Sequence, residues 1–271
     1  MRPKAVRASR FIASATLAGL LALSMAGCKT TGEEITGSVG SSAVPESEAG
    51  WRKSVELWGE RYKANPGDAE VAMAYARALR ATGQRAQAVA VLQQASIRNP
   101  RNMKLLGAYG RALADAGEYA QALDAFSRAH TPDNPDWRIL NAQGAVLDEM
   151  GRHREAQSHY AAALKIVPNE PSVLSNLGLS YALEKQLKRA EATLRTAAAQ
   201  PGVSPKVRQN LALVVGLQGR FDEAEKIASA DLPESEAAAN VAYLREMLAR
   251  QSAWKKNGKQ PYVPSPEAGS S

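Results

Sequence analysis

Two kinds of side chain in this sequence could carry chemistry at defined positions: its single cysteine and its three histidines. Cys28 has no second cysteine with which to form an intramolecular disulfide. His130, His153 and His159 are too few and too scattered to form a structural zinc site with one another. The sequence also contains no phosphate-binding loop, no nucleophile elbow and no His-Glu-Xaa-Xaa-His run. We therefore predict a protein that is not an enzyme and that needs no metal or other cofactor.

The sequence before Cys28 gives that residue a context. Four basic residues precede an uncharged apolar run at 11–25, which ends in the small residues Ala26 and Gly27. Residues 1–27 thus have the three parts of a secretory signal peptide. The apolar run is shorter than the roughly 20 residues that a membrane-spanning helix needs, so the pattern favours export and cleavage over permanent anchoring.

The stretch Met25-Ala26-Gly27-Cys28 resembles a bacterial lipobox, with methionine in place of the usual first leucine. The resemblance implies that Cys28 receives a diacylglyceryl group and becomes the first residue of the mature protein. A single acyl chain binds membranes only reversibly, but the three chains that the resemblance implies would anchor the protein stably. We therefore expect a membrane lipoprotein.

Cleavage changes the charge of the chain. The full sequence carries a formal net charge of +7, and removal of the four basic residues of the signal peptide leaves about +3. This excess is too small to indicate nucleic-acid binding. Residues 28–50 are rich in Gly, Ser, Thr and Glu and are expected to form a flexible tether with a reach of roughly 25 Å. A disordered tail is expected at 252–271.

The region between the tails repeats with a period of 34 residues. Three sets of residues recur at this spacing, and we call each set a column. They are a turn residue, an alanine five residues after it and a small residue seven residues before it. These columns are Gly83, Gly117, Gly151, Lys185 and Gly219; Ala88, Ala122, Ala156, Ala190 and Ala224; and Ala76, Gly110, Gly144, Gly178 and Ala212. Glycine tolerates the left-handed conformation that ends a helix, and small residues let two helices approach closely. The columns therefore predict helix hairpins.

The spacing and these residues resemble the tetratricopeptide repeat, which implies an all-α solenoid of antiparallel helix hairpins. Five copies are expected at 69–102, 103–136, 137–170, 171–204 and 205–238, within a domain at 51–251. Capping helices are expected on both sides, because terminal repeats would otherwise expose apolar faces. The fifth repeat is expected to have a short second helix, because Ala228 and Asp231 are poor core residues at their positions.

In this repeat family, partners bind a groove built largely from the first helices. The corresponding positions here hold Arg77, Arg80, Lys104, Arg111, Arg138, Asn141, Asn176, Lys206, Gln209 and Asn210. The N-terminal half of this groove is basic, although Glu70, Asp115, Asp148 and Glu149 also lie on groove-facing positions and could pair with the cations. The two asparagines at 176 and 210 stand where peptide-clamping members hold a ligand, but asparagine there can also serve packing between repeats.

The signal peptide, lipobox, tether, five repeats and closing segment at about 231–254 together resemble the TadD family of lipoproteins of the tight-adherence (Flp) pilus. The resemblance implies an outer-membrane lipoprotein that faces the periplasm and helps the pilus secretin to assemble. It implies protein partners and a membrane, without nucleic acid or a small-molecule substrate. Two alternatives remain open: an adaptor that recruits peptidoglycan enzymes, and a periplasmic chaperone.

Overall fold

A computed structural model describes residues 47–257 of the chain, and within that range it contains twelve α-helices and no strand. The all-α prediction is confirmed, while Cys28, the signal peptide and most of the tether and tail lie outside the described residues. The helices are α2 (Glu48–Ala64), α3 (Ala69–Ala81), α4 (Arg85–Arg98), α5 (Met103–Asp115), α6 (Tyr119–Ser127), α7 (Trp137–Glu149), α8 (His153–Ile166), α9 (Pro171–Leu183), α10 (Leu187–Ala198), α11 (Pro205–Leu217), α12 (Phe221–Ala228) and α13 (Glu234–Asn257).

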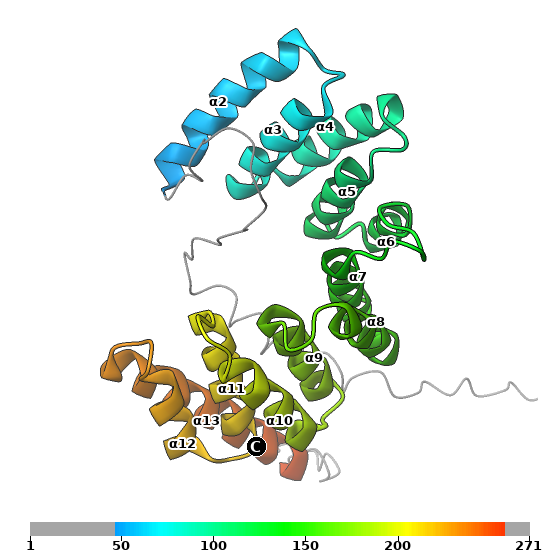
Figure 1. The fold of residues 1–271 in the computed structure, drawn as a ribbon. Coiled ribbons are helices and arrows are strands. Elements are labelled where there is room, and N and C mark those ends of the chain that lie inside the picture. The colour runs from blue at the N-terminus through cyan, green and yellow to red at the C-terminus, as the bar shows by residue number, and fades with distance from the viewer. Residues whose placement is uncertain (1–46, 258–271) are drawn as a thin grey trace, which may run out of the picture. The chain divides into compact units, whose positions relative to one another are not determined.

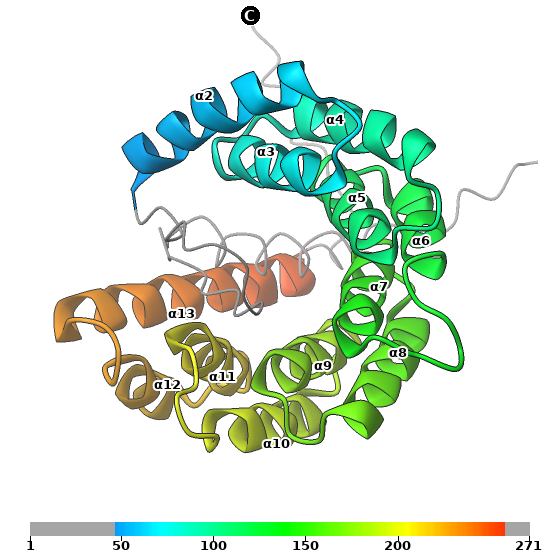
Figure 2. The same ribbon diagram turned by 45° about the horizontal axis from the view of Figure 1, so that its top comes forward.

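The described helices divide into two compact units, with α2–α7 in the first and α8–α13 in the second. In the first unit α3, α5 and α7 form one layer and α2, α4 and α6 form the other (Figure 1). In the second unit α9 and α11 lie side by side in one layer, and α8, α10 and α12 form the other (Figure 2). We call α3, α5, α7, α9 and α11 the first helices of their hairpins. The helix that follows each of them, α4, α6, α8, α10 or α12, is the second helix.

The turn column ends each first helix as predicted. Gly83, Gly117, Gly151 and Gly219 have φ between 74° and 83°, and Lys185 adopts the same left-handed conformation with φ 64°. The residue after each of them donates its N–H to the carbonyl five residues before itself, for example Gln84 to Leu79 at 2.8 Å. These bonds satisfy carbonyls that the helix end leaves without partners. Lysine therefore keeps the hairpin geometry, at some cost in backbone strain.

A second periodic feature begins each first helix. Asp68, Asn102, Asp136, Glu170 and Ser204 are spaced by 34 residues, and each accepts a hydrogen bond from a backbone N–H of the first turn that follows. Such N-caps satisfy amide groups that have no partner inside the helix. The repeat therefore specifies both ends of its first helix through local hydrogen bonds, although the sequence prediction used only the turn column.

The small-residue columns lie at helix crossings. A Cβ atom built on Gly110 would stand 2.6 Å from the Phe126 ring, and one built on Gly178 would stand 2.6 Å from Cγ of Leu194. Phe126 and Leu194 have no exposed surface, so neither can move aside freely. Glycine at these two positions is therefore required by the close approach of the helices, as the columns predicted.

The ends of the predicted domain differ in detail from the structure. Helix α2 begins at Glu48, three residues before the predicted start, where the Ser47 hydroxyl accepts a hydrogen bond from the Gly50 N–H. The second helix of the fifth repeat, α12, is short as expected, with 8 residues. Helix α13 then continues to Asn257, so the predicted boundary at 251 is too early. No proline or glycine interrupts residues 252–257, and nothing in that sequence stops the helix.

Candidate partner-binding surface

The cations predicted for the groove of the first unit lie on three first helices. Arg77 and Arg80 are on α3, Lys104 and Arg111 are on α5, and Arg138 is on α7 together with Asn141. Helix α3 packs against α5, and α5 packs against α7, so the three helices present successive rows of the same layer. Lys104 and Arg138 are exposed, whereas Arg77, Arg80, Arg111 and Asn141 are partly buried. The structure thus places this set along one layer.

The Arg77 guanidinium lies over an aromatic ring of the capping helix. Its guanidinium carbon lies 5.7 Å from the ring centroid of Trp51, which comes from the capping helix α2. A guanidinium over an indole gains a modest electrostatic attraction and keeps its charge and its hydrogen-bond donors. Helix α2 therefore contributes a side chain to the layer of α3, α5 and α7, which we call the basic layer.

Arg80 is matched by a carboxylate. Its Nε donates to Oδ2 of Asp115 at 2.5 Å, which links α3 to α5. Both side chains are about one-third exposed, so the pair contributes only about 0–1 kcal/mol to stability. The alternative that groove cations pair with acidic residues therefore holds for Arg80, and its charge is largely compensated.

The remaining cations of the first unit have different surroundings. A Cβ on Gly107 would lie 3.8 Å from a terminal nitrogen of Arg111, so this guanidinium lies beside Gly107, one turn earlier on α5. The close contact at Gly107 is with Ile139 of α7, whose Cδ1 would lie 2.8 Å from an added Cβ. The Arg138 guanidinium stacks over the neighbouring Trp137 ring at 4.4 Å. Arg77 of α3 and Arg138 of α7 thus each lie over a tryptophan ring, from α2 and from α7 itself.

In the second unit the predicted residues are mostly polar and uncharged. Asn176 is on α9, and Lys206, Gln209 and Asn210 are on α11. The Asn210 amide donates to the hydroxyl of Ser175 at 3.0 Å, and Ser175 is buried. Asn210 therefore joins α11 to α9, which is the packing role that the sequence left open. Lys206 is exposed, and Gln209 is partly buried.

A cluster of charged and polar side chains surrounds Glu191 of α10. Its carboxylate receives hydrogen bonds from Gln218 and Arg195 and pairs with Arg220 at 2.5 Å. The hydrogen bond from Arg220 is the main cause that lowers the pKa of Glu191 to about 2, and desolvation opposes it. Because the partners come from α10 and the turn between α11 and α12, this cluster ties adjacent hairpins together. Its groups are mutually satisfied, so it has a structural role.

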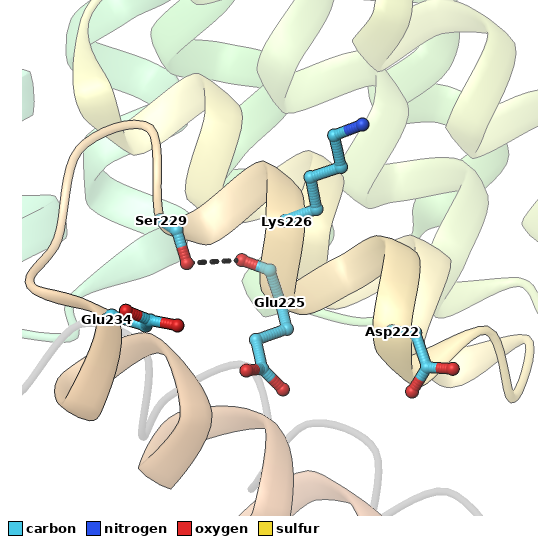
Figure 3. A pocket seen from close by; sticks show the side chains of 5 residues that line it. All are labelled: Asp222, Glu225, Lys226, Ser229 and Glu234. Atoms are coloured by element: carbon cyan, nitrogen blue, oxygen red, sulfur yellow. Dashed lines mark hydrogen bonds between the residues drawn. The ribbon is translucent and has the colours of Figure 1, made fainter.

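A surface depression beside α12 offers no metal site. Asp222, Glu225, Lys226, Ser229 and Glu234 line it (Figure 3). The Ser229 hydroxyl donates to the Glu225 backbone carbonyl at 2.9 Å, and the side chains project in different directions (Figure 3). Within residues 47–257 no group of three or more His, Cys, Asp or Glu side chains could hold a metal ion. None of the helices in that range is long and apolar enough to cross a membrane.

Two family models match the chain. Residues 141–205 match the model described as tetratricopeptide repeat, and residues 53–129 match the model of subunit 3 of the anaphase-promoting complex, cyclosome. The helix hairpins are tetratricopeptide repeats. The fold predicted from the 34-residue columns is therefore confirmed. A comparison with curated protein sequences finds no match.

Solved tetratricopeptide-repeat structures share this arrangement. The crystal structure of PilW, titled a widely conserved type IV pilus biogenesis factor, matches with a TM-score of 0.63 and 18% identity, over 72% of this chain and 91% of PilW. The Cut9-Hcn1 hetero-tetramer of the anaphase-promoting complex matches with a TM-score of 0.61 and 15% identity, over 74% of this chain. This chain covers 40% of the length of that match. At these identities the comparisons establish the repeat fold.

Proposed function

We propose that this tetratricopeptide-repeat protein is a non-enzymatic lipoprotein scaffold that binds a protein partner along the basic layer of α3, α5 and α7. Acyl groups on Cys28 would anchor it to the outer membrane on the periplasmic side. There it would act as a TadD-like factor in assembly of the tight-adherence pilus and its secretin. Its partner would present an acidic extended segment or helix to the layer.

The binding proposal rests on one observation: cations stand at equivalent positions on neighbouring helices. Arg77 and Arg111 occupy equivalent repeat positions on α3 and α5, which pack side by side. Packed helices are separated by about 8–10 Å, so a bound segment could meet both guanidinium groups in succession. Trp51 beside Arg77 adds an aromatic surface, and such rings are common anchors in interfaces.

The membrane and pilus parts of the proposal have separate support. The lipobox-like sequence at 25–28 and the tether after it support an anchored protein whose folded part stands off the surface. Lys29 replaces the aspartate that retains lipoproteins at the inner membrane of enteric bacteria, which favours the outer membrane. The overall plan of the chain resembles TadD, and the fold is shared with a pilus biogenesis factor, PilW.

The test reverses two charges in the basic layer. We expect Arg77→Glu with Arg111→Glu to leave the helical content and the membrane attachment unchanged, because both side chains are only partly buried and neither belongs to the apolar core. Like charges placed against an acidic partner weaken association by several kcal/mol, so co-purification of the secretin from solubilised membranes should fall by at least about tenfold. Surface piliation should fall with it.

A matched control carries the same charge change elsewhere in the first unit. Arg85→Glu with Arg101→Glu alters two exposed arginines of α4 and the loop after it. This control should retain the secretin. Equal loss in both variants would show a general charge effect, and unchanged co-purification in the groove variant would reject the basic layer as the binding site. Recovery of peptidoglycan hydrolases in place of the secretin would reject the pilus assignment.

A further inference from the structure

The two ends of the described chain are complementary halves of a repeat. Inside each unit a second helix packs against its own first helix and against the first helix that follows, as α4 does with α3 and α5 and α10 does with α9 and α11. Helix α2 packs against the following first helix, α3, and by its place in the register it is a second helix whose first helix is not among the described residues. Helix α13 packs against α11 and α12, just as α11 packs against α9 and α10 one repeat earlier. Within residues 47–257 it is therefore a first helix with no second helix after it.

The exposed face of α2 shows what a preceding first helix would cover. Leu57 and Trp58 stand 34 residues before Val91 and Leu92 of α4. Val91 and Leu92 are only 6% and 1% exposed, whereas Leu57 is 52% exposed. The same face carries Lys53 and Arg61, and the Arg61 guanidinium stacks over Trp58 at 4.7 Å. This face is thus an apolar centre with a cation one turn away on either side.

Helix α13 has an exposed face of opposite character. Ala237, Val241 and Leu244 pack inward and are buried. The exposed residues Glu236, Ala239, Tyr243 and Glu246 recur at helical spacing on the outer side, and Tyr243 is 48% exposed. The Glu246 carboxylate also pairs with Arg250 of the same helix at 2.5 Å. This face therefore places an apolar centre between Glu236 at one end and the Glu246–Arg250 pair at the other.

We propose that α13 of one copy packs against α2 of a second copy and completes a repeat between them. The first and second helices of a hairpin run antiparallel. In that direction Arg61 approaches Glu236, Leu57 meets Ala239 and Tyr243, and Lys53 approaches Glu246. Lys53 and Arg61 are about 12 Å apart along α2, and Glu236 and Glu246 are about 15 Å apart along α13, so both charge pairs form in one register.

The surrounding sequence favours a second copy over an internal helix. In the 34-residue register the missing first helix would fall at 35–47, and that stretch contains Gly37, Gly40 and Pro45. These residues have the lowest helix propensities, so the chain itself is poorly suited to fill the position. Because the two faces differ, the contact is head-to-tail and each copy retains one open end, which permits short chains of molecules. The proposal does not depend on the membrane anchor or on the pilus partner.

Photo-crosslinking of the full chain tests which molecule covers α2. A benzoylphenylalanine at position 57 is activated in a mixture of ¹⁵N-labelled and unlabelled protein, and mass spectrometry locates the cross-link. We expect cross-links to residues 236–250 that join labelled to unlabelled chains. Cross-links that stay within one chain, or that reach only a lipid or another protein, would overturn the proposal. A complete lack of cross-links would also overturn it, provided that sedimentation shows self-association at the same concentration.

Charge exchange tests the register. Lys53→Glu with Arg61→Glu should weaken self-association, measured by sedimentation in detergent, by at least about tenfold because like charges then face each other. Adding Glu236→Lys and Glu246→Lys should restore it, whereas Arg85→Glu with Arg101→Glu should have no effect. A monomeric parent protein at all concentrations, or a reversal that the second pair fails to rescue while the helical content is intact, would refute the interface.

Discussion

Gly178 offers the sharpest test of how the hairpins are packed. It lies on α9, where a Cβ would stand 2.6 Å from Cγ of Leu194 and 3.3 Å from the carbonyl oxygen of Ala190, both on α10. Carbon atoms in contact normally lie about 3.5–4.0 Å apart. The substitution Gly178→Ala therefore overlaps the branched carbon of a side chain that is fully buried.

The expected cost is the difference of two effects. Overpacking of a core costs about 1–3 kcal/mol. Alanine is more favourable than glycine inside a helix by about 1 kcal/mol, which offsets part of that cost. We therefore expect Gly178→Ala to lower the free energy of unfolding of the second unit by up to about 2 kcal/mol.

A double-mutant cycle isolates the clash. Leu194→Ala alone should cost about 2–5 kcal/mol because it leaves a cavity. In that background Gly178→Ala should become neutral or stabilising, since only the helix propensity remains. Gly59→Ala serves as a milder control, because its nearest contact is a Tyr75 ring carbon at 3.3 Å.

Urea denaturation followed by circular dichroism gives the free energies, and hydrogen exchange of α9 and α10 shows whether the loss is local. Exchange is needed because repeat arrays do not always unfold in one step. The reasoning is refuted if Gly178→Ala costs the same in the parent protein and in the Leu194→Ala background, or if it stabilises the parent protein.

Three further perturbations give distinct results. Because the folded pKa of Glu191, about 2, lies below its ordinary 4.5, the cluster should stabilise fully above pH 4.5 and lose about 3 kcal/mol as pH falls towards 2; denaturation at several pH values should show this loss in the parent and less of it in Glu191→Gln. Arg208→Met removes the two hydrogen bonds that its guanidinium donates to Asp231, whose side chain is 9% exposed, and should cost about 2 kcal/mol in a urea melt and speed hydrogen exchange at the start of α13; unchanged exchange would contradict this role. Cys28→Ser should release the protein from membranes and abolish uptake of labelled fatty acid, with density-gradient separation of the two membranes as the check on location; continued membrane association would contradict acylation.

The sequence alone determined the repeat and its hairpins. Turn residues such as Gly117, small residues such as Gly110 and the short α12 could be inferred because each acts within one hairpin, through φ, helix contact or core volume. Even Lys185 fitted the register, since the hydrogen bonds of its neighbours fix the turn. The N-caps carried the same period and were available in the sequence. Interactions that are local and recur in every repeat can be recognised as a period in the sequence.

The candidate site could be predicted only as a set of positions. Sequence placed Arg77, Arg80 and Arg111 on one layer, but the tertiary structure decided that Arg80 is paired with Asp115 and that Arg77 stacks on Trp51. It likewise gave Asn210 a packing contact. These contacts join residues from different repeats or from a cap, where the period imposes no particular partner. Charge compensation at the surface depends on the distance between specific side chains, which only the packing of neighbouring helices fixes.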